Sequence, residues 1–177
     1  SARDRMLREH TYAHRARDVE AALGAGSRGA VPPRRGPRRM SIVIIGLSIT
    51  SSWGNGHATT YRGVVRGLAA RGHDVLFLER DVPWYADNRD DAQPEGARTA
   101  LYGGLAELED RFAGAVRDAD LVIVGSDVPD GIEVGRGALD TARGGTAFYD
   151  IDTPVTLGAL GAGTCAYLER ELVPRYQ

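Results

Sequence analysis

The chain has 177 residues, of which 42% are hydrophobic, and this is enough for one domain with a core of its own. A single cysteine, Cys165, excludes an intramolecular disulfide and a cysteine-built zinc site, and no apolar run approaches the roughly 20 residues that span a bilayer, so we expect a cytoplasmic protein without a membrane span. Charge is divided unevenly, because residues 1–39 carry ten arginines against four acidic residues, whereas residues 40–177 carry twelve against twenty, which indicates two segments of different origin.

Two segments precede Met40. Residues 1–23 have a loose apolar stripe and many alanines, which predicts a helix, and we interpret it as the tail of a preceding protein. Residues 24–39 consist mainly of Gly, Pro and Arg with little to bury, which predicts a disordered linker. A solvated linker explains this basic tract, so we expect no nucleic-acid partner. A new domain then spans residues 40–177.

The segment from Ser41 to Leu78 predicts a βαβ unit. The short β-branched run Ile42 to Ile45 is typical of a strand buried on both faces. A polar loop from Ser48 to Gly56 leads into a helix that begins at His57 and shows apolar residues at helical spacing. Val75 to Leu78 is the second strand. The N–H groups at the start of the helix would favour an anionic or polar ligand.

The remaining pattern repeats strand and helix. Apolar residues at steps of three and four, from Leu101 to Val116, predict one helix from Arg98 to Arg117. Pro154 predicts the first turn of a later helix with Thr153 as its cap. Further strands are predicted at Leu121 to Val124 and Thr146 to Tyr149, with a helical segment at Gly131 to Arg143 between them. The fold class is therefore α/β: a Rossmann-like parallel sheet of about four strands with flanking helices.

The first loop carries the main candidate site. Gly54 and Gly56 would let a ligand approach the backbone, Asn55 adds an amide, and His57 could act as a general base near neutral pH. A tight turn with a solvated histidine is the simpler alternative.

A dinucleotide fingerprint is the closest competing pattern. Gly54 and Gly56 could be its first two glycines, with Glu79 as the acidic residue about 20 positions further on. Thr59 stands at the third glycine position, however, and the loop begins well past the strand. A dinucleotide-binding domain of an oxidoreductase therefore remains the alternative.

Polar and aromatic residues also follow the other strands. Asp127, Asp150 and Asp152 come at strand ends, where they could bind sugar hydroxyls or orient a base, or could cap helices. Glu79 follows the second strand, and Trp84 and Tyr85, shortly after it, could stack on a sugar ring or pack against the sheet edge. We expect His57, Glu79, Asp127 and Asp150 on one rim of the sheet.

The run GLSITSSWGNGHATTYRGVVRGLAARGHDVLFLERDVPWYADN closely resembles the N-terminus of CgeB-like, spore-coat-type glycosyltransferases, and AFYDIDTPVTL is similar to a later segment of them. The resemblance covers residues 40–177 and implies the N-terminal half of a GT-B fold. It implies sugar transfer from a nucleotide-sugar donor to a small-molecule or glycan acceptor, usually without a bound metal and with no other cofactor. His57 matches the position at which several GT-B enzymes carry their catalytic base.

The same resemblance implies what the chain lacks. In GT-B enzymes the N-terminal half mainly holds the acceptor, and the C-terminal half, which holds most of the nucleotide-sugar site, is not in this sequence. The run REHTYAHRARDVEAAL resembles the closing helix of a CgeB-like protein, as if the tail of one enzyme preceded the first half of another. We therefore expect the fragment to be inactive alone, and a non-catalytic binding module remains a third alternative.

Overall fold

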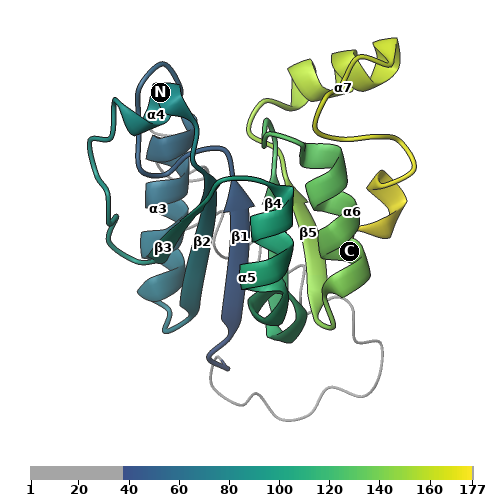
Figure 1. Ribbon diagram of the computed structural model, residues 1–177. Coiled ribbons are helices and arrows are strands. Elements are labelled where there is room, and N and C mark those ends of the chain that lie inside the picture. The colour runs from purple at the N-terminus through teal and green to yellow at the C-terminus, as the bar shows by residue number, and fades with distance from the viewer. Residues whose placement is uncertain (1–37, 177) are drawn as a thin grey trace, which may run out of the picture.

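The computed structural model of the chain describes residues 38–176. In this part of the chain five parallel strands form one sheet in the order β3-β2-β1-β4-β5, which confirms the predicted Rossmann-like α/β class (Figure 1). The strands are β1 (Ser41–Gly46), β2 (Asp74–Arg80), β3 (Arg98–Tyr102), β4 (Leu121–Gly125) and β5 (Gly145–Tyr149). The predicted helix over residues 1–23 and all but the last two residues of the predicted linker lie outside the described residues.

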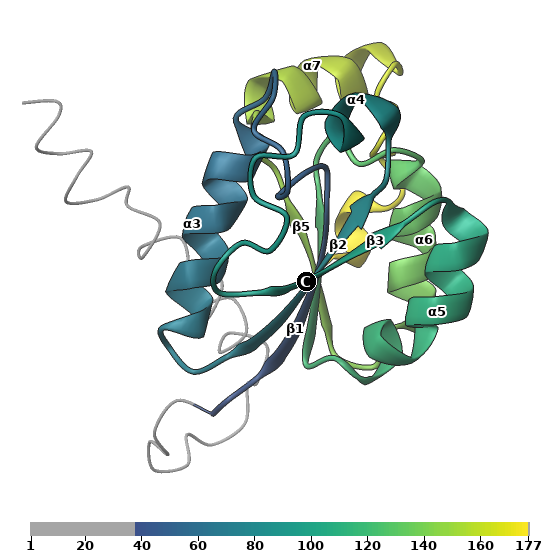
Figure 2. The ribbon, with the colours of Figure 1, turned by 60° about the vertical axis from the view of Figure 1, so that its left-hand side comes forward.

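Helices cover both faces of the sheet. They are α3 (His57–Ala69), α4 (Pro83–Ala86), α5 (Leu105–Asp118), α6 (Gly131–Thr141), α7 (Thr153–Ala162) and the short 3₁₀ helix η1 (Val173–Arg175). Figure 2 shows α3 on one face and α5 with α6 on the other. Within residues 38–176, no helix is both long enough and apolar enough to cross a membrane.

The central strand β1 contributes to a core on each face. Ile42 and Ile44 belong to the cluster under α3, whereas Val43 and Ile45 belong to the cluster under α5 and α6. All four side chains are almost fully buried. This two-sided burial explains why the strand has a continuous apolar run and no alternation of apolar and polar residues.

The carboxyl ends of the strands form one aligned edge. Gly46 at the end of β1 pairs with Glu79 of β2, and Gly125 at the end of β4 pairs with Tyr149 of β5. Because β1 and β4 are themselves paired, the two glycines lie side by side. The order of the strands reverses between β1 and β4, and ligands of open α/β sheets bind at the carboxyl edge beside such a reversal.

The segment predicted as one helix from Arg98 to Arg117 is instead a strand followed by a helix. β3 pairs with β2 over residues 98–102, so the sheet has five strands where the sequence predicted about four. Leu101 fitted the helical spacing but lies on the strand, and Gly103 and Gly104 separate it from α5. The reason is tertiary, since the free edge of β2 supplies backbone hydrogen bonds that outweigh the local spacing.

The last described residues pack back along α6. α7 begins at Thr153 with Pro154 in its first turn, but its N-cap position is Asp152, which corrects the predicted cap. Beyond α7, Leu168 and Leu172 are buried, and side chains from this segment contact α6. Burial of these two leucines holds the segment after α7 against the domain, although most of its other residues are charged or polar.

Candidate functional site

A buried carboxylate holds the loop between β1 and α3 from below. Glu79 is fully buried and accepts hydrogen bonds from the backbone N–H groups of Ile49 (2.6 Å) and Thr50 (2.9 Å) and from the Thr50 hydroxyl (2.7 Å). The Ser48 hydroxyl also donates, at 3.4 Å, to Oε1, the oxygen that accepts from the Thr50 hydroxyl. Because Glu79 has no exposed surface, it braces the loop from inside, and this corrects the substrate-binding role predicted for it.

A second clamp holds the same loop from the side. Arg62 of α3 donates two parallel hydrogen bonds to Asp90 (2.8 and 3.1 Å), and its Nε donates to the carbonyl of Ile49 (2.8 Å). Asp90 also accepts hydrogen bonds from the backbone N–H (3.0 Å) and the hydroxyl (2.7 Å) of Ser52. The hydrogen bonds from Arg62 and Ser52 hold the pKa of Asp90 well below its usual range. The loop therefore has a fixed shape before any ligand arrives.

The side chain of Asn55, in the loop before α3, caps the start of that helix. Its Oδ1 accepts hydrogen bonds from the N–H groups of His57 (3.0 Å) and Ala58 (3.3 Å), and its Nδ2 donates to the carbonyl of Trp53 (3.0 Å). Two helix N–H groups that the sequence predicted to favour a ligand are thus already satisfied. The amide of Asn55 takes part in the same contacts, so Asn55 has a capping role, and its predicted substrate contact stays a prediction.

The two glycines of the loop face open space. Gly54 has a φ of +66°, which favours glycine, whereas Gly56 has a φ of −88°, which any residue can adopt. A Cβ at either position would meet no atom within 4 Å. The backbone at both positions can therefore be approached from outside, as a ligand loop requires.

His57 is the imidazole at this edge of the sheet. Its Nε2 lies 3.5 Å from Oδ2 of Asp127, while its Nδ1 is buried and has no hydrogen-bond partner among the described residues. Burial lowers the pKa of His57 below 6.5, and the carboxylates of Asp127, Asp150 and Asp152 act in the opposite direction. The ring is consequently neutral at pH 7 and can accept a proton.

The ends of β4 and β5 are tied together, which brings the predicted aspartates to the same rim. The N–H of Ser126 donates to the carbonyl of Tyr149 (3.0 Å), and the N–H of Ile151 donates to the Ser126 hydroxyl (3.3 Å). Asp127 and Asp150 follow directly on these two strands. Asp127 has a left-handed backbone with a φ of +62°, a conformation that few non-glycine residues adopt but that aspartate adopts more often than most.

Asp150 and Asp152 differ in their surroundings. Oδ1 of Asp150 accepts hydrogen bonds from the Thr156 hydroxyl (2.9 Å) and from the Asp152 N–H (3.2 Å). The Thr156 hydroxyl also lies 2.8 Å from the hydroxyl of Tyr167. Asp152 is exposed at the start of α7 and makes no side-chain cap. Asp150 is therefore held in place, whereas Asp152 contributes charge at the surface.

Tyr61 is a residue of this site that sequence reasoning missed. It lies one helical turn after His57, is fully buried, and packs edge-on against Phe77 with ring centroids 4.9 Å apart. Its hydroxyl would lie 1.8 Å from a Cβ at Gly125 and has no hydrogen-bond partner among the described residues. Burial raises its pKa far above the usual 10.0, so the phenol stays neutral. The spacing of four residues from His57 was the available sequence signal.

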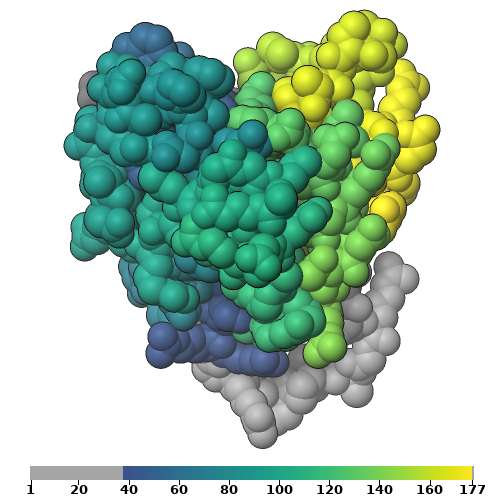
Figure 3. Space-filling view, in the orientation of Figure 1, coloured from purple at the N-terminus to yellow at the C-terminus, as the bar shows by residue number. Residues whose placement is uncertain are grey.

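Two tryptophans are exposed on the same edge of the molecule. Trp84 on α4 is 53% exposed, and Trp53 in the β1–α3 loop is 55% exposed, whereas Tyr85 is buried. Of the two predicted stacking residues, only Trp84 is therefore open to a ligand, and Tyr85 packs into the fold. Figure 3 shows this edge notched between the teal atoms around α4 and the yellow-green atoms around α7.

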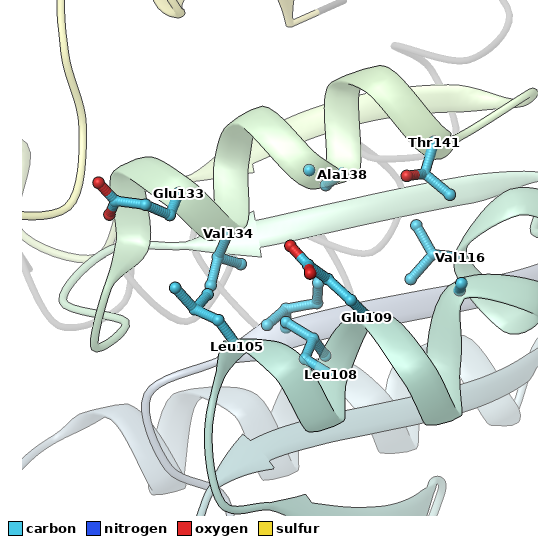
Figure 4. Close-up of a pocket in the computed structure, with 11 residues that line it drawn as sticks. Leu105, Leu108, Glu109, Val116, Glu133, Val134, Ala138 and Thr141 are labelled. Atoms are coloured by element: carbon cyan, nitrogen blue, oxygen red, sulfur yellow. The ribbon is translucent and has the colours of Figure 1, made fainter.

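A cavity of about 150 Å³ lies apart from this edge, in the seam between α5 and α6 (Figure 4). Its walls are mostly apolar, and Glu109 and Glu133 lie at its border. Small residues such as Gly137 and Ala138 leave this space where the two helices meet. Within residues 38–176, no group of three or more His, Cys, Asp or Glu residues is arranged to hold a metal ion.

No protein-family model and no curated protein matches the chain. Among solved structures, a glycerate dehydrogenase related protein from Thermoplasma acidophilum matches with a TM-score of 0.40 and 15% sequence identity, over 85% of this chain and 50% of that one. The chain thus spans about half the length of that protein. Fold and site together define a Rossmann-like α/β domain with a polar, aromatic-edged rim.

Proposed function

We propose that this domain is the acceptor-side half of a GT-B glycosyltransferase similar to the CgeB-like proteins, and that His57 is its general base. The observation that carries the proposal is the pair formed by His57 and Asp127, 3.5 Å apart, at the carboxyl edge beside the reversal of strand order. The lowered pKa of His57 supports it, because a base must be neutral at the working pH. The resemblance of residues 40–177 to those proteins supplies the reaction type.

In the proposed reaction the acceptor hydroxyl lies at Nε2 of His57, since Nδ1 is buried. The hydroxyl gives its proton to Nε2 while its oxygen bonds to the anomeric carbon of the donor sugar. The bond from that carbon to the nucleoside diphosphate breaks, and the diphosphate leaves with the electron pair. Asp127 then stabilises the imidazolium ion that has formed.

The donor phosphates would bind mainly to another domain. Phosphate groups favour free backbone N–H groups at a helix start, and Asn55 already occupies those of His57 and Ala58. Asp127, Asp150 and Asp152 add negative charge at the same place. This agrees with the division of labour expected of GT-B halves, in which the second half holds the nucleotide sugar.

The contacts around β1 weigh against the dinucleotide alternative. A dinucleotide fingerprint places its glycines directly at the end of the first strand, where the backbone approaches the pyrophosphate. Here the rings of Phe77 and Tyr61 fill the space over Gly46, and Tyr61 fills the space over Gly125. The glycines of the loop lie further along the chain, at Gly54 and Gly56. The third alternative, a binding module without catalytic activity, is distinguished from a glycosyltransferase by the turnover experiment below.

The direct test uses a longer protein in which this domain is joined to a donor half, with release of nucleoside diphosphate as the readout. His57→Ala should lower turnover by about 10²–10⁴-fold, the usual contribution of a general base. Thr59→Ala, a change on the exposed surface of the same first helical turn, should leave it unchanged. Near-normal turnover of His57→Ala would show that His57 is not the general base, and absence of transfer by the wild type would favour the binding module.

A second measurement on this chain alone addresses the oxidoreductase alternative. Titration with NADH and with nucleotide sugars, followed by calorimetry, should show no tight binding of NADH. Micromolar or tighter NADH binding would overturn the glycosyltransferase proposal.

A further inference from the structure

The exposed large apolar side chains of the domain gather on the rim that carries His57. Within residues 38–176 five such side chains are exposed, namely Trp53, Trp84, Val155, Leu157 and Val173. Four of them lie on the β1–α3 loop, on α4 or on α7, which Figures 1 and 2 both place at the same edge. Exposed apolar groups scattered singly need no explanation, but a concentration on one edge marks a binding surface.

The composition of α7 strengthens this observation. From Thr153 to Ala162 the helix carries no charged residue, and Val155 and Leu157 are 58% and 63% exposed. A helix that is apolar on all sides is normally covered in the working state of a protein. α7 follows β5 directly after Asp150 and Asp152. A ligand that covers α7 therefore also lies beside two of the carboxylates whose charges raise the pKa of His57.

The charges of the rim exclude an anionic occupant. Three aspartates influence the pKa of His57 by their charge, namely Asp127, Asp150 and Asp152. Nearby arginines do not offset them, because each is paired with another aspartate in the ion pairs Arg62–Asp90, Arg80–Asp130 and Arg89–Asp81. At the start of α3, the N–H groups of His57 and Ala58 already donate to Asn55. A carboxylate or phosphate on the ligand would therefore meet repulsion from these three aspartates, and the three arginines named here are already paired.

We propose that the acceptor is an uncharged amphipathic alcohol, with its hydroxyl at His57 and an apolar body lying across Trp53, Trp84 and the exposed side of α7. This rests on the proposed function, since it names the substrate class of the same site. The apolar rim supplies binding free energy, whereas the aspartates and His57 select the neutral hydroxyl end. The buried hydroxyl of Tyr61, unpartnered among the described residues, lies close enough to Asp127 and Asp150 for their charges to raise its pKa.

The test measures binding to the chain by tryptophan fluorescence. The chain has two tryptophans, Trp53 and Trp84, and both lie on this rim, so their emission reports binding there directly. Three probes are titrated below any micelle concentration: octyl glucoside, glucose, which lacks the apolar body, and octyl glucuronide, which adds a carboxylate. Octyl glucoside should change the emission saturably, octyl glucuronide should bind about tenfold more weakly or worse, and glucose should have no effect.

Matched variants locate the binding surface. Leu157→Ser should weaken octyl glucoside binding by roughly tenfold, because it removes one exposed apolar anchor. Val173→Ser removes an exposed apolar side chain on η1, beside α6, and should leave binding unchanged. The inference is overturned if octyl glucoside does not saturate, if octyl glucuronide or glucose binds equally well, or if both variants bind alike. It is also overturned if the wild type is a dimer that Leu157→Ser dissociates, since a second copy of the chain would then cover the exposed side of α7.

No sugar donor takes part in this measurement, so its result is independent of catalysis. Loss of octyl glucoside binding would overturn the acceptor class even if transfer occurred. Failure of His57→Ala to lower turnover would overturn the proposed base and leave the binding result in place.

Discussion

The hydroxyl of Tyr61 lies where a side chain at Gly125 would have to be, 1.8 Å from the position of a Cβ there. The ring also lies close to the corresponding position at Gly46, at 2.9 Å. Two adjacent strands thus end in residues without side chains, which leaves room for the Tyr61 ring over both glycines and for the Phe77 ring at Gly46. This contact couples the packing of α3 to the geometry of the candidate site.

Gly125→Ala should therefore destabilise the domain, because the Tyr61 ring would have to move out of a closely packed position. Overpacking of this kind costs about 1–3 kcal/mol. Gly137→Ala is the matched control, since its Cβ would meet no atom within 4 Å and alanine favours the interior of α6. We expect a gain of roughly 0.5–1 kcal/mol from Gly137→Ala. Urea unfolding of both variants measures the difference, and equal stability of the two would contradict the packing argument.

The pKa of His57 can be measured by NMR titration of the imidazole C–H signals, assigned by their loss in His57→Gln. It should lie below 6.5, because burial disfavours the charged ring. Asp127→Asn should lower it further, since the nearby carboxylate favours the imidazolium. A pKa at or above 6.5 in the wild type, or a rise in Asp127→Asn, would show that the two groups do not interact as described.

Folding stability should follow the same titration. The unfolded chain binds a proton at His57 at a higher pH than the folded chain does, so protonation favours unfolding. The contribution of His57 to the free energy of unfolding is fully present above pH 6.5 and is lost as the pH falls below that value toward the lower pKa of the folded chain. In urea unfolding at a series of pH values, His57→Gln should show a shallower dependence between pH 7 and pH 5 than the wild type.

Glu79→Gln should destabilise the domain, because an amide N–H₂ would face donors that now reach a carboxylate. An unsatisfied buried donor costs about 1–3 kcal/mol, and Glu79 accepts from at least two groups on Thr50. Amide exchange of residues 49–52 should also become faster, since the brace of the loop is weakened. Glu95→Gln, at an exposed position, should change the stability by less than about 0.5 kcal/mol. If both variants unfold at the same urea concentration, Glu79 is not a brace.

Asp90→Asn should alter the response of the domain to acid. The pKa of Asp90 is held below 3.8 by hydrogen bonds from Arg62 and Ser52, so its ionised form stabilises the fold. That contribution is complete above pH 3.8 and is lost as the pH falls toward the lower folded pKa. The gap in unfolding free energy between wild type and Asp90→Asn should therefore narrow between pH 5 and pH 3. Ser52→Ala, which removes one donor, should lie between the two, and a gap that is independent of pH would contradict the role of Asp90.

Where the signal was local and strong, the sequence predicted the structure well. The β-branched run at Ile42 to Ile45 predicted the central strand, and the apolar spacing after His57 predicted α3. A rim of strand-end residues was expected from the same pattern, and the structure brings Asp127 within 3.5 Å of His57. The helix predicted from Arg98 failed because pairing with β2 is a contact between segments that spacing within one segment cannot reveal.

By itself, therefore, the sequence determined the fold class, the buried strands and the gathering of polar residues at one edge, because these follow from hydrophobic period and strand direction. Only the tertiary structure decided what each polar residue does there. Glu79 and Asn55 looked like ligand residues, but burial and capping engage them within the chain, whereas Tyr61 looked like an ordinary helix residue and closes the site. The physical reason is that a polar group is available to a ligand only if no group of the folded chain already satisfies it. For Glu79 such a partner, the N–H of Ile49, lies 30 residues away in the sequence, and only the fold brings the two together.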